Sequence, residues 1–247
     1  MRRSAFFSGA LILIILGIWE SACRGFNVPD FILPPPSRII TVAVFQAPML
    51  WPHAATTALE VLTGILLSLM VAVPLAMVMF ARPALENAIA PFLVASQAVP
   101  VFAIAPLLVI WLGYGIASKV LMAAVIIFFP ITVSLLEGFK SCDAEFRVLF
   151  QLMGAGFWKT MRLLYWPWAL PYFFAGLKVG VSVATIGAVI GEWVGAQQGL
   201  GYLMIQANAR LKVDLVFAAI LWLSFMGLSL WVVVGYLERI IIRWKQV

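Results

Sequence analysis

Charged residues are scarce in this sequence. Asp, Glu, Lys and Arg make up only 11% of the 247 residues, against about 25% in a typical soluble domain. Hydrophobic residues make up 64%, and the mean hydropathy is +1.09. These values exclude an ordinary soluble domain and indicate an integral membrane protein, in which one helical membrane domain accounts for the whole length. The net charge of +6 fits basic cytoplasmic loops better than a nucleic-acid partner.

Metal, redox and enzyme signatures are also lacking. The single histidine, His53, excludes a histidine-rich metal site, and Cys23 and Cys142 have no metal or redox spacing. We expect the two cysteines on opposite sides of the membrane, where they do not pair. The sequence has no His-Glu-x-x-His, Gly-x-Ser-x-Gly or Walker A motif. We therefore predict no catalytic residue, no metal and no cofactor bound by this chain, and no ATP hydrolysis by it.

Six apolar segments are near or above the ~20 residues that cross a bilayer. The first, residues 5–19, follows a basic start, and we interpret it as an uncleaved span rather than a signal peptide because no Ala-x-Ala site follows. The other five are residues 54–80, 91–111, 117–136, 172–194 and 215–237. The sequence thus predicts an all-α polytopic membrane protein, with residues 54–247 forming a five-span core.

Residues 24–53 differ from the rest in their proline content. Pro34-Pro35-Pro36 and Pro48 argue against a long helix there. We interpret residues 1–53 as the first span and a proline-rich outer segment, with a short surface helix near 37–46.

The distribution of Lys and Arg predicts the orientation. With the N-terminus inside, ten of these residues lie in inner segments: Arg2, Arg3, Arg82, Lys140, Arg147, Lys159, Arg162, Arg239, Arg243 and Lys245. Five lie in outer segments: Arg24, Arg38, Lys119, Arg210 and Lys212. Both termini are therefore expected in the cytoplasm.

Residues 143–171 form the longest segment in the C-terminal two thirds that is too polar for a lipid core. Leu149, Leu152 and Met153 recur at helical spacing, which predicts a short amphipathic helix. Gly154-Ala155-Gly156 ends that helix, and a second basic, aromatic piece is expected to stop at Pro167 and Pro171. Such a cytoplasmic elbow between spans is a candidate contact for a soluble partner.

Ionisable residues inside spans are candidates for a transport path or gate. These are Glu60, Lys178 and Glu192, to which we add Gln97 because it cannot easily reach an interface. The alternative is that Lys178 extends to the inner interface and that the two glutamates reach outer headgroups or water. Three prolines, Pro100, Pro106 and Pro130, predict kinks in the third and fourth spans.

Small residues line the fifth span. Gly176 with Gly180, and Gly187 with Gly191, form two G-x-x-x-G patterns that allow helices to approach closely. These patterns are consistent with helix packing within the chain and with a dimer face, and the sequence does not decide between the two.

The elbow carries a recognisable pattern. Gly154 is followed, after nine residues, by Leu164-Tyr165-Trp166-Pro167. This resembles the motif of ABC importer permeases, which is Glu-Ala-Ala, three residues, Gly, nine residues and Ile-x-Leu-Pro. Further stretches are similar to the nitrate/sulfonate/taurine-type branch: residues 32–37, 105–107, 111–115, 169–172, 175–178 and 199–202. The resemblance covers nearly the whole chain.

The sequence departs from the motif at one place. Val148, Leu149 and Phe150 stand where the family has Glu-Ala-Ala. Glu145, one helical turn earlier, is a candidate substitute for the missing glutamate.

The resemblance implies a type I, methionine-importer-like permease of the bacterial inner membrane, with six transmembrane helices. It implies that two permease subunits, here a homodimer, form the path, and that each elbow is a coupling helix docked on an ABC ATPase that binds ATP-Mg. A periplasmic or lipid-anchored binding protein would deliver the substrate. The coupling residues implied are Glu145, Val148, Leu149, Phe150, Gly154, Ala155, Lys159 and Pro167.

The substrate is indicated by one late stretch. Residues 187–196, followed by Gly199-Leu200-Gly201-Tyr202, are similar to permeases for thiamine pyrimidine precursors. Permeases for riboflavin, sulfonate or taurine, and nitrate are similar there too. A secondary transporter or channel would more often show inverted repeats, and none is evident; a membrane enzyme has no supporting motif.

Overall fold

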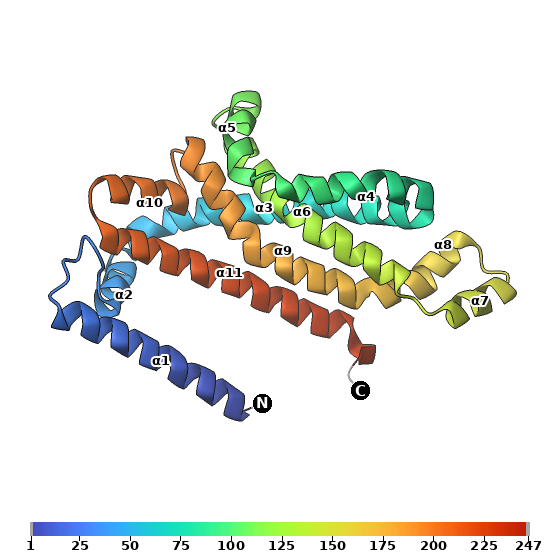
Figure 1. Ribbon diagram of the computed structural model, residues 1–247, viewed down its shortest axis with the longest axis horizontal. Helices are drawn as coiled ribbons and strands as arrows, with labels where there is room; N and C mark the ends of the chain where they lie inside the picture. The colour runs from blue at the N-terminus through green and yellow to red at the C-terminus, as the bar shows by residue number, and fades with distance from the viewer. Residues whose placement is uncertain (1, 246–247) are drawn as a thin grey trace. The chain divides into compact units, whose positions relative to one another are not determined.

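A computed structural model describes residues 2–245 of the chain. This part is helical and contains no strand, which confirms the all-α prediction (Figure 1). The α-helices are α1 (Arg2–Gly25), α2 (Pro36–Phe45), α3 (Ala47–Ala81), α4 (Pro83–Ala98), α5 (Val101–Leu112), α6 (Ile116–Lys140), α7 (Ala144–Leu152), α8 (Phe157–Thr160), α9 (Trp166–Gly195), α10 (Leu200–Ala209) and α11 (Val213–Ile241). A π-helical turn, η1 (Met161–Tyr165), joins α8 to α9, and a 3-10 turn, η2 (Arg243–Lys245), follows α11.

Within residues 2–245, four continuous helical stretches are long and apolar enough to cross a membrane: α3, α6, the run Phe157–Gly195 and α11. The pair α4 and α5 makes a fifth if it counts as one bent span. The expected first span lies in α1, where the side chains of residues 2–6 and 8 are outside the described part, as is that of Lys245. The exact number of six spans therefore stays a prediction.

The third predicted span, residues 91–111, is not one straight helix. It is divided between α4 and α5, which meet at an angle of 98°. The break falls at Val99, whose φ of −82° and ψ of 119° are extended, and Pro100 caps the start of α5. Proline disfavours helical geometry in the residue before it, so Pro100 turns the chain rather than kinking one helix.

Between α1 and α3 the proline-rich segment contains only the ten-residue helix α2, as expected. Pro48 lies in the first turn of α3, which begins at Ala47; a missing N–H costs little at that position.

One expectation about proline stops is wrong. Pro167 and Pro171 do not end a helix, because the run Phe157–Gly195 passes through both. The wider π-helical turn η1 ends at Tyr165, two residues before Pro167, and local π geometry is one way in which helices accommodate a proline.

The chain divides into two compact units. The first comprises Met1–Thr57 and Gln197–Phe225, and the second comprises Ala58–Ala196 and Met226–Val247. Helices α3 and α11 each contribute residues to both units, and each unit is described separately below.

The second unit is organised on an antiparallel contact between α6 and α9 (Figure 1). A Cβ atom added at Gly176 would lie 2.6 Å from the carbonyl oxygen of Pro130, and one at Gly187 would lie 2.8 Å from the Cα of Ala123. A Cβ at Gly180 would lie 2.9 Å from Cγ2 of Ile127, and one at Gly191 would lie 3.1 Å from the Cα of Lys119, both in α6. The small residues of the fifth span thus serve helix packing within the chain.

Apolar clusters surround this helix pair. One joins residues of α3, α6, α9 and α11, among them Val61, Ile127, Val181 and Val234. Another joins α3, α4, α6 and the start of α9 around Phe139, whose ring lies 5.3 Å from that of Phe80.

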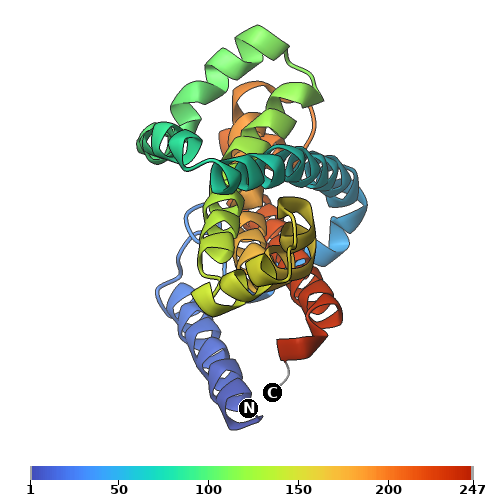
Figure 2. The same cartoon turned by 90° about the vertical axis from the view of Figure 1, so that its right-hand side faces the viewer.

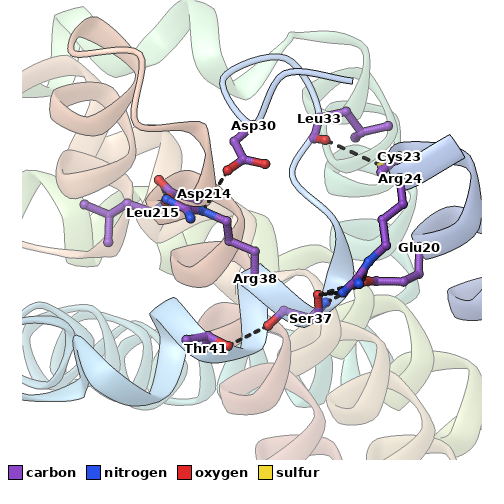
Figure 3. Close-up of polar contacts among 10 residues, drawn as sticks. All are labelled: Glu20, Cys23, Arg24, Asp30, Leu33, Ser37, Arg38, Thr41, Asp214 and Leu215. Carbon is purple, nitrogen blue, oxygen red and sulfur yellow. Dashed lines mark hydrogen bonds and ion pairs between the residues drawn. The ribbon is translucent and has the colours of Figure 1, made fainter. Parts of the chain in front are cut away.

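In the first unit, the proline-rich segment is fixed by polar contacts (Figure 3). The backbone N–H and the hydroxyl of Ser37 donate to the carboxylate of Glu20, and Arg24 forms an ion pair with the same carboxylate. Arg38 in α2 forms ion pairs with Asp30 and Asp214, both at 3.1 Å. The short surface helix predicted near 37–46 corresponds to α2.

The start of α10 is capped from α3 in the same unit. The Gly199 N–H donates to His53 Nδ1 at 3.1 Å, and the Leu200 N–H donates to Thr57 Oγ1 at 2.9 Å. These contacts satisfy donors that a helix N-terminus leaves free. Gly199 has a φ of +117°, which a residue with a side chain rarely adopts.

We predict that Gly176→Ala destabilises the protein by about 1–3 kcal/mol, because the added methyl group meets the backbone of α6. Gly227→Ala is the matched control, since its Cβ would lie 3.7 Å from Thr185, an ordinary contact. Apparent melting temperatures of the two purified variants in detergent test this. Equal melting temperatures for both variants and the unmodified protein would contradict the packing described here.

Candidate functional site

The elbow lies at one end of the second unit. Helix α7 follows the last turn of α6, and α8 leads through η1 into α9, so that α7 and α8 project beyond the ends of the α6–α9 pair (Figure 1). Figure 2 shows the elbow facing the viewer. Within the predicted segment 143–171, the helix that becomes α9 already begins at Phe157.

Gly154 ends α7 in a Schellman motif. Its N–H donates to the Gln151 carbonyl, and the Ala155 N–H donates to the Phe150 carbonyl, both at 3.0 Å. Gly154 itself has a φ of +67°. This is the residue type and the pair of hydrogen bonds that close a helix with a left-handed residue, so Gly154 is required by the turn.

Helix α7 has no buried residue in the isolated chain. Leu152 and Met153 are 82% and 72% exposed, and Val148 and Leu149 are about half exposed. Large apolar side chains gathered on a surface helix are typical of a protein contact.

The other predicted coupling residues are placed around this helix. Glu145 is exposed in the first turn of α7, Phe150 is half-buried, and Lys159 is exposed in α8. Pro167 is half-buried in the first turn of α9, at the C-terminal side of the elbow. Ala155, half-buried, supplies one of the two closing hydrogen bonds.

An aromatic contact joins α7 to the start of α9. The ring of Phe146 lies 5.7 Å from that of Trp168 at the start of α9. The thiol of Cys142, between α6 and α7, is buried, and burial raises its pKa. Both cysteines are free thiols.

A buried charge cluster forms the second candidate feature of this unit. Glu60 in α3, Lys119 in α6 and Glu192 in α9 are each at most 2% exposed. The carboxyl groups of Glu60 and Glu192 are hydrogen-bonded to each other, and both act electrostatically on Lys119. Two of the four predicted path or gate residues are therefore brought together.

Lys119, counted above with the residues of the outer segments, is buried. It lies in the first turn of α6, with its amino group turned inward to backbone carbonyls. The sequence signal for this burial is the position of Lys119, three residues into a long apolar helix.

Gln97 and Lys178 do not join this cluster. Gln97 is exposed near the end of α4. Lys178 does not extend freely to an interface, because it forms an ion pair with Glu238 of α11 and lies 5.6 Å from the ring of Trp231.

The first unit carries a separate polar recess of about 410 Å³. Its lining combines acidic and basic side chains with apolar ones: Asp30, Phe31, Arg38, Gln46, Leu211, Lys212, Asp214 and Leu215.

Comparison with known proteins identifies the class. The model of the family described as "binding-protein-dependent transport system inner membrane component" matches residues 64–243. The chain belongs to this family. It is therefore the permease, or translocating, component of an ABC importer rather than a catalytic subunit, and its fold is that of type I importer permeases.

Individual relatives cover the chain almost completely. The permease is 40% identical to a probable ABC transporter permease protein of Haemophilus influenzae, over 92% of this chain and 93% of the relative. It is 36% identical to the formylaminopyrimidine transport permease protein ThiX of Halalkalibacterium halodurans, over 95% and 94%. It is 37% identical to the riboflavin transport system permease protein RibX of Chloroflexus aurantiacus, over 95% and 88%.

We predict that Gly154→Arg abolishes import while the permease still inserts and accumulates normally. A left-handed conformation costs a residue with a side chain about 1–2 kcal/mol, and relief of that strain would reshape the elbow. Gly156→Arg is the matched control, because Gly156 has a φ of −68° and no atom within 4 Å of an added Cβ. Uptake and membrane protein level are measured for both; equal loss of import would refute the role of the left-handed turn.

Proposed function

We propose that this permease imports a thiamine pyrimidine precursor, driven by a separate ABC ATPase that docks on the α7 elbow and supplied by a binding protein on the outer face. ATP and Mg²⁺ are bound by the ATPase, and the permease supplies the path. The binding protein is periplasmic or lipid-anchored.

The docking proposal rests on the exposed apolar face of α7. A partner that covers Leu152 and Met153 removes apolar surface from water, which favours association. Val148 and Leu149, which stand in place of the usual glutamate and alanine, extend the same apolar face. Glu145, exposed one turn earlier, supplies a carboxylate for the polar part of the contact.

The distribution of charge supports an elbow and two termini in the cytoplasm. Lys119 is buried, and removing it from the outer set leaves ten inner Lys and Arg residues against four outer ones. This strengthens the bias that defines the cytoplasmic side.

Two copies of this chain form the path in this proposal. The exposed apolar side chains of α11, among them Leu228, Val232 and Tyr236, face either lipid or the second copy. The polar recess beside Arg38, which we place on the outer face, is a candidate contact for the binding protein.

The substrate assignment is supported by the formylaminopyrimidine relative and by the motif at residues 187–202. Riboflavin is the second candidate, because the riboflavin relative has nearly the same identity to this chain, 37% against 36%. Relatives for taurine and sulfonates are less similar, at 27% and 24%.

We predict that deleting this gene abolishes uptake of labelled aminopyrimidine precursor and that a plasmid copy restores it. The neighbouring ATPase and binding-protein genes stay intact, and labelled riboflavin and taurine are tested in parallel. Loss of riboflavin uptake alone would overturn the pyrimidine assignment in favour of the second candidate.

The same assay separates docking from substrate identity. Leu152→Glu places a charge in the apolar face, so restored uptake should be lost and the ATPase should no longer co-purify. Gln151→Glu is the control, because it adds the same charge at an exposed neighbouring position. Normal uptake and co-purification by Leu152→Glu would remove the docking assignment.

A further inference from the structure

The ammonium group of Lys119 donates all of its hydrogen bonds to backbone carbonyls. Its Nζ donates to the carbonyl oxygens of Tyr114 at 2.6 Å, Gly115 at 3.0 Å and Gly195 at 2.8 Å. A lysine has three N–H donors, so these three contacts satisfy it completely. The nearby carboxyl groups therefore act on Lys119 through charge rather than through hydrogen bonds.

These contacts join two segments that are far apart in sequence. Tyr114 and Gly115 lie in the short loop between α5 and α6, whereas Gly195 is the last residue of α9. A cation at the C-terminal end of a helix is favourable because the final carbonyls have no partner within the helix. Ser118 strengthens the loop side, since its hydroxyl donates to the carbonyls of Gly113 and Gly115.

A glycine and two buried carboxyl groups surround the Lys119 side chain. A Cβ at Gly191 would lie 3.1 Å from the Cα and 3.2 Å from the Cγ of Lys119, so glycine at this position lets α9 lie tightly against the lysine stem. The hydrogen bond between Glu60 and Glu192 requires a proton on one of the two carboxyl groups. The three buried groups together then carry no net charge, which is the condition under which charges are tolerated away from water.

The position of Lys119 relates it to the elbow. The helical run Phe157–Gly195 has 39 residues, a length of roughly 60 Å at the rise of an α-helix. It begins at the elbow and ends at the carbonyl that Lys119 binds. Helix α6, packed along α9, likewise has Lys119 at one end and the connection to α7 at the other (Figure 1).

We propose that Lys119 is a positioning residue that ties the end of α9 to the α5–α6 loop, so that movement of the elbow is carried to the opposite end of the second unit. The proposal rests on the proposed function, in which the ATPase moves the elbow. The tie itself consists of the three carbonyl contacts, and the two glutamates balance its charge.

The test uses the complete importer, with its ATPase and binding protein, reconstituted in lipid vesicles. The variant is Lys119→Met combined with Glu192→Gln, which removes the tie but keeps the buried groups neutral overall. The control is Lys140→Met with Glu86→Gln, which removes a more exposed ion pair from the other end of α6. Uptake of the labelled precursor and ATP hydrolysis are measured with and without loaded binding protein.

We expect the Lys119 variant to assemble with the ATPase and to hydrolyse ATP, yet to lose at least tenfold in uptake per ATP consumed. The control should keep the uptake per ATP of the unmodified importer. Unchanged uptake per ATP in the Lys119 variant would overturn the tie, and so would failure of that variant alone to assemble, which would show a purely structural role. Failure of the unmodified importer to couple uptake to ATP would instead overturn the proposed function.

Discussion

The close approach of α6 and α9 is the constraint on which the rest of the second unit depends. Glycine at 176, 180, 187 and 191 removes the side chains that would otherwise separate the two backbones. Without a hydrophobic drive between helices in lipid, such packing is a principal source of association. Because the contact extends along most of both helices, displacement of one helix end is transmitted to the other end rather than lost in side-chain rearrangement.

Two features lie at opposite ends of this helix pair. At one end, α7 presents apolar side chains on a turn closed by Gly154. At the other, Lys119 binds the last carbonyl of α9 and the loop before α6. A permease in which an external ATPase does the chemical work needs a stiff connection between the docking surface and the path. The α6–α9 pair has the length and the continuity for that connection.

The sequence predicted the helical class, the short helix of the elbow and the glycine turn because each depends on local residue chemistry. The sequence does not predict the features that depend on contacts between distant segments. The helix through Pro167 and Pro171 continues because π geometry precedes them and the neighbouring helices support it, and Lys119 is buried because carbonyls from two distant segments surround it. Pro100 was recognised as an interruption, but the 98° angle it allows between α4 and α5 depends on how those helices pack.

We infer that α6 and α9 move as one body when the ATPase cycles. Spin labels at Glu137→Cys in α6 and Trp193→Cys in α9, in a chain whose native cysteines are replaced by alanine, measure the distance between the two helices' opposite ends. An importer containing one labelled copy is compared without nucleotide and with ATP trapped on the ATPase. Movement as one body requires the same single distance in both states. A shifted distance, or a second population on ATP binding, would show that the helices slide and would contradict it.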